Sequence, residues 1–424
     1  MPERPSDCAG PARHRAQSPQ PIPANGSAPR PAHYDFIDAL RGLAFLAVFM
    51  LHASLMTDGL PPLLGSILGR GYAGVQLFFV VSALTLAMSL KGRASEPAPL
   101  TAFYIRRLLR IAPMFWCAMA LYLLSGGLGP RWGAPQGLTS TDVALATLFL
   151  HGFDLYALNG VVPGGWSVAV EMQFYLLLPL LLSFANSLKR TAILLAAMIV
   201  VSALSLPVLD ALARRLYPGA PQGLVHEFAF FSLPTQLPVF GCGLLLYRLL
   251  GPDREALARF EKYLPANVHW RAVLILLVVL ALGLPIDWSA TPLALVRHFP
   301  GHIGYGVLFA LSAYALARAP LRLLVNPITR FLGDISYSAY LLHFSVLEQV
   351  DRLVRPIADS RPLLHLALLG CGAFFATALF AAVTRRLIER PGIEIGRMLI
   401  ARIAPRPARE RLADEMLVGG TRRE

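Results

Sequence analysis

Charged residues are scarce in this chain. They make up only 15% of its 424 residues, whereas 55% are apolar. A soluble domain usually has about 25% charged residues, so this chain could not cover a soluble surface with polar groups. The composition therefore excludes a soluble globular enzyme and favours a membrane protein.

Cysteines are also few, and none of the four lies in a pair spaced for metal binding. Cys8 lies in a polar segment, and the other three are single residues within apolar runs. The sequence therefore indicates neither a zinc site nor a disulfide framework, and we expect no metal.

The two ends of the chain have few consecutive apolar residues. Residues 1–33 are rich in Pro, Ala, Ser and Arg and contain no apolar run, so we expect a disordered cytoplasmic tail without a signal peptide. Residues 392–424 are Arg-rich and are expected to form a basic cytoplasmic tail. Residues 34–391 then form one membrane domain. It contains no visible internal repeat, which weakens the case for a transporter built from two halves.

This middle region is a succession of apolar runs that predicts an all-α bundle of about ten transmembrane helices. Several runs are shorter than the roughly 20 residues that cross a bilayer, so neighbouring residues must extend them. The runs are Phe36–Met56, Ala73–Leu90, Ile111–Leu124, Val168–Phe184, Thr191–Leu209, Phe228–Leu246, Ala272–Ile286, Ile303–Ala317, Phe331–Leu347 and Leu363–Thr384.

The net charge of +13 gives the orientation of these helices. With ten spans and both termini inside, 30 of the 38 Lys and Arg residues lie in cytoplasmic segments. Counting Thr141–Leu158 as a further span would invert everything after it, so we expect a re-entrant or surface helix there. The excess charge is thus a signal of topology, and we expect no nucleic-acid partner. We expect a bacterial-type cytoplasmic (inner) membrane.

Ionisable residues within membrane spans are costly and are candidates for function. Arg41 and His52 are 11 residues apart, which places them on one face of a helix and roughly 16 Å apart along its axis. Asp38 can neutralise the guanidinium from the preceding turn. The alternative is structural: a packing hydrogen bond for His52 and an interfacial Arg41.

Two further ionisable residues are expected at a similar depth in the outer half of the membrane. Glu171 begins the fourth span and shares a helix face with Ser167, four residues earlier. His343 lies about two thirds of the way along the ninth span. The alternative for Glu171 is a salt bridge to an outer-loop arginine: Arg70, Arg131 or Arg297.

A basic motif precedes the third span. Arg107 and Arg110 are three residues apart on one helical face at the cytoplasmic boundary, and paired guanidiniums at this spacing suit phosphate oxygens. Anchoring of the helix and contact with anionic lipids is an alternative.

As a set, these residues resemble the acyltransferase 3 family of integral-membrane acyltransferases, in the form without a fused esterase-like domain. The resemblance extends from about Tyr34 to Pro391. It rests on five separated motifs: Asp38-Ala39-Leu40-Arg41-Gly42 with the later His52, Phe78-Phe79-Val80-Val81-Ser82, Arg106-Arg107-x-x-Arg110, Trp166-Ser167-x-x-x-Glu171-x-Gln173-Phe174-Tyr175, and Gly333-x-Ile335-Ser336-Tyr337-Ser338-x-Tyr340-Leu341-Leu342-His343.

The resemblance implies transfer of an acyl group, usually acetyl, from acyl-CoA to a hydroxyl of a cell-surface glycan or glycoside. The Arg41/His52 pair and the Arg107/Arg110 motif match its functional signatures. The acceptor, the acyl chain and the oligomeric state remain open.

We expect Arg107 and Arg110 to hold the CoA phosphates, and Arg41 to assist them or line the path of the thioester. His52 is expected to be the general base, or else the nucleophile that forms an acyl-imidazole. Glu171 would orient or balance a catalytic imidazole, and His343 is a second candidate base.

Other motif residues are expected to support the substrates or the structure. Ser82 is a candidate to bind substrate or an oxyanion, with a helix–helix hydrogen bond as its structural alternative. The remaining members of this group are Asp38, Trp166, Ser167 and Tyr337.

One rival function remains at this point. A non-enzymatic carrier or flippase of an envelope precursor could use His52, Glu171 and His343 as a proton relay.

Overall fold

A computed structural model describes residues 35–251, 269–283 and 301–403 of the chain. These residues are mainly helical and contain no β-strand, as the apolar runs predict. The expected tail at residues 1–33 and the part of the basic tail beyond residue 403 lie outside the described residues. Residues 392–403 of that tail belong to a helix.

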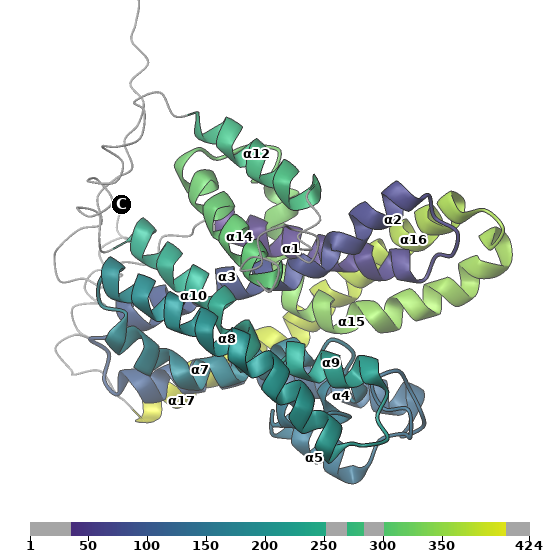
Figure 1. Ribbon diagram of the computed structural model, residues 1–424, viewed down its shortest axis with the longest axis horizontal. Helices are drawn as coiled ribbons and strands as arrows, with labels where there is room; N and C mark the ends of the chain where they lie inside the picture. The colour runs from purple at the N-terminus through teal and green to yellow at the C-terminus, as the bar shows by residue number, and fades with distance from the viewer. Residues whose placement is uncertain (1–34, 252–268, 284–300, 404–424) are drawn as a thin grey trace, which may run out of the picture. The chain divides into compact units, whose positions relative to one another are not determined.

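The helices follow one another along the chain as in Figure 1. The first half contains α1 (Asp35–Leu55), α2 (Pro62–Gly69), η1 (Arg70–Ala73), α3 (Gly74–Gly92), α4 (Pro99–Gly126), α5 (Ser140–Thr147), η2 (His151–Phe153), α6 (Ala157–Gly160) and α7 (Trp166–Phe184). The second half contains α8 (Leu188–Leu216), α9 (Gln222–Phe230), α10 (Leu233–Leu250), α12 (Trp270–Gly283), α14 (Gly301–Arg318), α15 (Pro327–Ala358), α16 (Pro362–Thr384), η4 (Arg385–Glu389) and α17 (Arg390–Ile403).

Seven helices of the described part are long and apolar enough to cross a membrane. They contain seven of the ten expected runs: α1, α2 with α3, α4, α7, α8, α9 with α10, and α16 with α17. The other three runs lie in α12, α14 and α15, although the end of the seventh run falls beyond the described residues. The total of ten crossings and the cytoplasmic position of both termini stay predictions.

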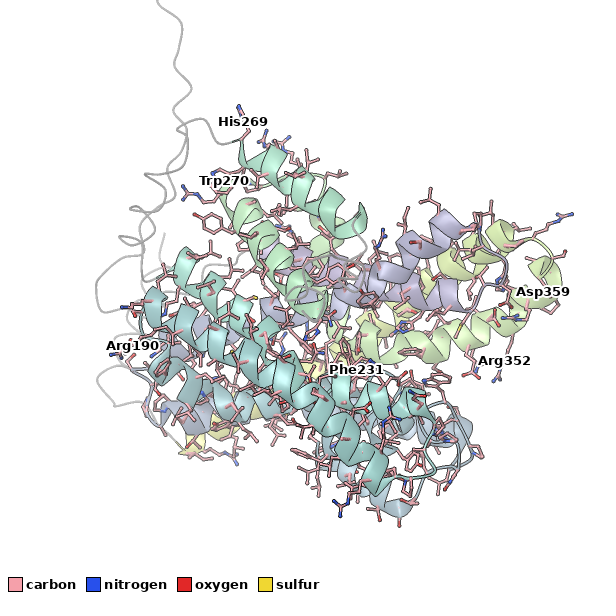
Figure 2. All side chains as sticks on the ribbon, in the orientation of Figure 1. Arg190, Phe231, His269, Trp270, Arg352 and Asp359 are labelled. Carbon is pink, nitrogen blue, oxygen red and sulfur yellow. The ribbon has the colours of Figure 1, made fainter. Side chains whose placement is uncertain are left out.

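Charged residues that the sequence predicts on opposite sides of the membrane can be located in Figure 2. Figure 2 labels Arg190, near the start of α8, on the left of the view. Arg352 and Asp359, at the end of α15, lie on the right.

Several helix boundaries differ from the apolar runs. Helix α4 begins at Pro99, well before the apolar run at Ile111, because its first turns carry the arginine motif and are amphipathic. The run Phe228–Leu246 is broken between α9 and α10, where Pro234 stands in the first turn of α10. Helix α15 continues to Ala358 because its last turns are held by ion pairs rather than by apolar packing.

The segment Thr141–Leu158 is not one continuous helix. It contains α5, η2 and α6, all short, and none is among the seven candidate spans. Helix α5 begins with a capping box, in which Thr139 and Asp142 satisfy each other's backbone N–H groups. It ends close to Phe149, whose φ of 60° lies in the left-handed region and turns the chain.

Helices α1 and α15 cross at two glycines. A Cβ atom added to Gly333 would lie 1.8 Å from the carbonyl oxygen of Asp38, and one added to Gly42 would lie 2.1 Å from that of Thr329. Only glycine therefore permits this approach. The crossing fixes how far each helix is displaced along the other.

Replacing Gly333 with Ala should destabilise the protein by about 3 kcal/mol or more, because the added methyl group meets backbone atoms that cannot rotate away. Thermal unfolding of purified protein in detergent measures this effect. Gly370→Ala is the control, since its Cβ would meet no atom within 4 Å. Equal melting temperatures for the two variants would contradict the close crossing.

Candidate functional site

Three arginines form the first part of the site. Arg41 on α1 interacts electrostatically with Arg110 on α4, and Arg107 interacts with both. In the described part of the chain, none of the three forms an ion pair with an acidic side chain. We call Arg41, Arg107 and Arg110 the arginine cluster. Like charges held this close favour binding of an anion.

Neighbouring arginines of the α4 motif contact different partners. Arg106 Nη1 lies 2.8 Å from Oε2 of Glu96, outside the cluster. The guanidinium of Arg107 instead lies over the rings of Phe103 and Tyr175, at 5.7 and 6.0 Å from their centres. Its Nε atom is buried and has no hydrogen-bond partner. A buried donor without a partner is uncommon and leaves a hydrogen bond for a ligand to make.

Two carboxylates face the arginine cluster. Arg41 interacts electrostatically with both Glu171 and Glu389. Glu171 accepts hydrogen bonds from Ser82 on α3 and from Tyr175 on its own helix, α7. The hydroxyl of Ser82 is therefore used in a helix–helix hydrogen bond, the structural alternative for this residue.

Glu389 lies beside the arginine cluster, although the sequence did not point to it. Its side chain is buried, with 3% of the residue exposed, and it accepts a hydrogen bond of 3.0 Å from Ser338 on α15. It ends the π-helical turn η4, a local geometry that often occurs at functional sites. In the sequence it follows the last apolar run among arginines, so it resembled one more cytoplasmic charge.

Glu171 makes no ion pair with Arg131, one of the outer-loop arginines considered for it. The Arg131 guanidinium donates to carbonyl oxygens of its own loop, at 3.0 Å for Gly126 and also to Gly127. Arg297 lies outside the described residues. Glu171 thus belongs with the arginine cluster, and no contact between Glu171 and either imidazole is found among the described residues.

Two histidines form the second part of the site. Nε2 of His343 on α15 lies 3.1 Å from Nδ1 of His52 on α1, and the ring centres are 5.1 Å apart. His343 is fully buried and His52 is half-buried. Phe344 packs against both rings, at 4.2 and 4.3 Å. We call His52 and His343 the histidine dyad.

The hydrogen bonds of the dyad are consistent with one pair of tautomers when both rings are neutral. Nδ1 of His343 is 2.6 Å from the carbonyl oxygen of Tyr340, which can only accept, so this nitrogen carries a hydrogen. In the neutral ring Nε2 of His343 is then an acceptor, and Nδ1–H of His52 donates to it. This leaves the lone pair of His52 on Nε2, away from His343.

Neighbouring hydrogen bonds hold the helix that carries His343. The hydroxyl of Ser167 lies 3.0 Å from that of Tyr340, which also donates to the Gly164 carbonyl at 3.1 Å. The Tyr122 hydroxyl on α4 donates to the Leu341 carbonyl at 2.9 Å. These bonds connect α15 to α4 and to the start of α7, and they restrict its rotation.

The remaining predicted residues lie around these two groups. The Tyr337 hydroxyl donates to the Ile111 carbonyl at 2.8 Å and connects α15 to α4 beside the arginine cluster. The Trp166 ring stacks on Phe231, with ring centres 4.0 Å apart. Asp38 interacts electrostatically with Arg41, and its carbonyl faces Gly333 at the helix crossing.

The site therefore has two parts joined by α1. Arg41 and His52 are 11 residues apart on this helix, or roughly 16 Å along its axis. The arrangement has three arginines at one end and two imidazoles within hydrogen-bond distance of each other at the other.

A family model described as an acyltransferase domain matches residues 34–385. The match covers most of the chain and includes both parts of the site except Glu389. The chain belongs to the acyltransferase 3 family. It is a membrane acyltransferase, and the geometry above is that of a family member.

Three curated relatives extend this finding. The chain is 25% identical to the "Putative membrane-bound transacylase BcsY" of Komagataeibacter xylinus, over 73% of this chain and 71% of that protein. It is 23% identical to the "Regulator of hypoxia-inducible factor 1" of Caenorhabditis elegans, over 85% and 80% of the two chains. It is 28% identical to the "Peptidoglycan O-acetyltransferase OatA" of Listeria monocytogenes, over 40% of this chain and 27% of that protein. No solved structure matches the chain.

A third histidine supports the start of α7 from outside the membrane-spanning helices. His151 in η2 is buried and lies flat against Phe115, with ring centres 5.3 Å apart. Its Nε2 lies 3.0 Å from the carbonyl of Gly165, directly before Trp166. Burial lowers the pKa of this imidazole to about 4.

The free energy of unfolding should therefore decrease at acid pH, because His151 is harder to protonate in the folded than in the unfolded protein. The unfolded imidazole has a pKa of about 6.5, so the unfolded state binds a proton first, and stability is lost as the pH falls from about 6.5 toward 4. His151→Gln keeps a donor near Gly165 but does not titrate. Thermal unfolding at pH 7 and pH 5 should show a smaller loss in this variant than in the wild type. An equal loss would contradict the assignment.

Proposed function

We propose that the protein transfers an acyl group, usually acetyl, from acyl-CoA to a hydroxyl of a cell-envelope glycan or glycoside. The carrying observation is that α1 joins, through Arg41 and His52, a histidine dyad to an arginine cluster that forms no ion pair among the described residues. In a bacterium, the matching location is the cytoplasmic membrane.

The arginine cluster suits the phosphates of coenzyme A. Guanidinium groups bind phosphate oxygens through paired, charge-assisted hydrogen bonds, and the buried Nε of Arg107 has such a bond to offer. Glu171 and Glu389 balance the cluster while no anion is bound. Neither is in ion-pair contact with an arginine of the cluster, so an incoming phosphate does not have to break a salt bridge.

The length of the donor fits the spacing of the two parts. With its phosphates at the arginine cluster, the extended pantetheine arm spans a distance of the order of the roughly 16 Å between Arg41 and His52. The thioester then meets the dyad, while the nucleotide stays at the cytoplasmic side.

The free lone pair on Nε2 of His52 makes it the general base. It removes the proton of the acceptor hydroxyl as the hydroxyl oxygen attacks the thioester carbonyl. The C–S bond then breaks, and the leaving thiolate takes that proton from the imidazolium. His343 accepts the hydrogen bond from Nδ1–H of His52 and holds this tautomer. Attack by the same nitrogen to form an acyl-imidazole is the second possible route.

A relative supports the class of acceptor. The Listeria protein is named a peptidoglycan O-acetyltransferase, and the chain spans about a quarter of its length. Mass spectrometry of envelope glycans, with and without the gene for this protein, tests the acceptor class directly.

Arg107→Gln should raise the KM for acetyl-CoA by about tenfold or more, because one charge-assisted phosphate contact is lost. Arg106→Gln is the matched control: it removes the same charge from the neighbouring residue, whose partner is Glu96. Release of CoA by protein in nanodiscs measures both variants. The same rise in KM for both variants would favour a general electrostatic effect over a phosphate site.

His52→Ala should lower the rate of acyl transfer by about a thousandfold, the contribution of a well-placed general base. His343→Gln should cost less, about ten- to hundredfold, because it disturbs the orientation of the base rather than removing it. Both should still bind CoA. A His52→Ala protein that transfers acyl groups at the full rate would exclude this role.

A further inference from the structure

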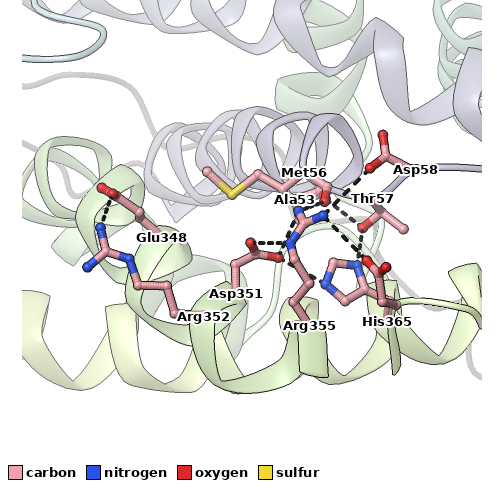
Figure 3. Close-up of polar contacts among 10 residues, drawn as sticks. Ala53, Met56, Thr57, Asp58, Glu348, Asp351, Arg352, Arg355 and His365 are labelled. Atoms are coloured by element: carbon pink, nitrogen blue, oxygen red, sulfur yellow. Dashed lines mark hydrogen bonds and ion pairs between the residues drawn. The ribbon is translucent and has the colours of Figure 1, made fainter. Parts of the chain in front are cut away.

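The end of α1 is held by a polar cluster that the proposed reaction does not use. Asp351 and Arg355 on α15 and His365 on α16 surround the residues that follow His52 on α1, as Figure 3 shows. We call Asp351, Arg355 and His365 the α1 clamp. Helices α15 and α16 run beside each other at this end of the molecule (Figure 1).

The clamp makes two hydrogen bonds to the chain at the end of α1. Nη2 of Arg355 donates to the carbonyl oxygen of Met56 at 2.9 Å. The Thr57 hydroxyl donates to the Ala53 carbonyl at 3.0 Å, so its oxygen accepts from Nδ1 of His365, 3.1 Å away. A cation placed at the last carbonyls of a helix also interacts favourably with its dipole.

Asp351 joins the two residues that touch α1. Its Oδ2 lies 2.9 Å from Nε of Arg355, and its Oδ1 lies 2.9 Å from Nε2 of His365. The approach to His365 is close but does not have hydrogen-bond geometry, and Nε2 of His365 has no hydrogen-bond partner among the described residues. His365 is almost fully buried, so water cannot easily take the place of the Asp351 carboxylate beside its ring. Asp58 and Asp359 also approach Arg355, at 3.6 and 3.5 Å, but both are well exposed and contribute little.

The position of the clamp gives it a role in the histidine dyad. Helices α1 and α15 cross at Gly42 and Gly333, and His52 and His343 each lie ten residues further on. The clamp then binds Thr57, five residues after His52. The dyad therefore lies between two fixed points, and the 3.1 Å bond between its rings depends on both.

We propose that Asp351 is a positioning residue: through His365 and Arg355 it holds the end of α1 so that His52 keeps its hydrogen bond to His343. This inference rests on the proposed role of His52 as the base. Asp351 touches neither substrate, and its effect passes through the position of α1 alone.

A neighbouring ion pair on the same helix provides a control. Glu348 Oε1 lies 2.5 Å from Nη2 of Arg352, and both side chains are mostly exposed. Figure 3 shows this pair pointing away from the end of α1. Glu348→Gln therefore removes the same kind of charge from α15 and leaves the clamp intact.

The test compares Asp351→Asn with Glu348→Gln in full-length protein in nanodiscs. For Asp351→Asn we expect kcat to fall about tenfold or more, with the KM for acetyl-CoA within about twofold of the wild type, because the arginine cluster is far from the clamp. Glu348→Gln should change neither. Asp351→Glu should restore part of kcat, since it returns the carboxylate. Unchanged kcat in Asp351→Asn, or an equal rise in KM, would overturn the proposal.

A second readout does not depend on acyl transfer. Modification of His52 by diethyl pyrocarbonate, followed by mass spectrometry, should be several-fold faster in Asp351→Asn, because the ring is released from His343. If the protein does not tolerate Asp351→Asn, Thr57→Val should show the same change, because it removes the hydroxyl that accepts from His365 just after α1 and donates to the Ala53 carbonyl. If His52 is modified faster in Asp351→Asn but the wild type transfers no acyl group, the proposed function is refuted while the clamp is supported. Unchanged modification in both variants would refute the clamp.

Discussion

The close crossing of α1 and α15 is the constraint on which the rest of the site depends. Two glycines bring the backbones into contact, so the displacement of one helix along the other cannot vary. Each helix then advances ten residues, about 15 Å, and places an imidazole at the same level. A larger residue at either glycine would separate the helices and with them the dyad. The ten-residue spacing from Gly42 to His52 and from Gly333 to His343 thus has a geometric cause: it brings the two histidines to the same distance from the helix crossing.

The second feature of the structure is that the arginine cluster and the histidine dyad lie apart. Arginines from α1 and α4 gather with two carboxylates at one level, whereas the dyad consists of two imidazoles within hydrogen-bond distance of each other at another level. An anion bound by the cluster would be attracted strongly, because the three arginines are only partly exposed to solvent. The dyad, in contrast, needs a neutral imidazole with a free lone pair. Placing the two groups some three helical turns apart lets each have the environment that its task requires.

The sequence predicted the helices well, and the structure brings the candidate site residues into two groups, but their partners could not be predicted. Apolar composition is a strong signal, so the spans α1, α3, α7 and α16 were predicted with nearly the observed limits. Helical periodicity placed Arg41 and His52 on one face. It could not place Glu171 with the arginines rather than the imidazoles, because the partner of a side chain depends on tertiary packing. Glu389 was missed for the same reason. The polar last turns of α15 were missed because they are stabilised by ion pairs such as that between Asp351 and Arg355 rather than by an apolar run.

The most direct test of this account is the structure of the protein in nanodiscs with a non-hydrolysable acetyl-CoA analogue. We predict that the phosphates contact Arg41, Arg107 and Arg110 and that the acyl carbon lies within reach of Nε2 of His52. Density for the analogue that leaves the arginine cluster empty, or that ends away from the dyad, would contradict the central claim that one helix connects the donor site to the base.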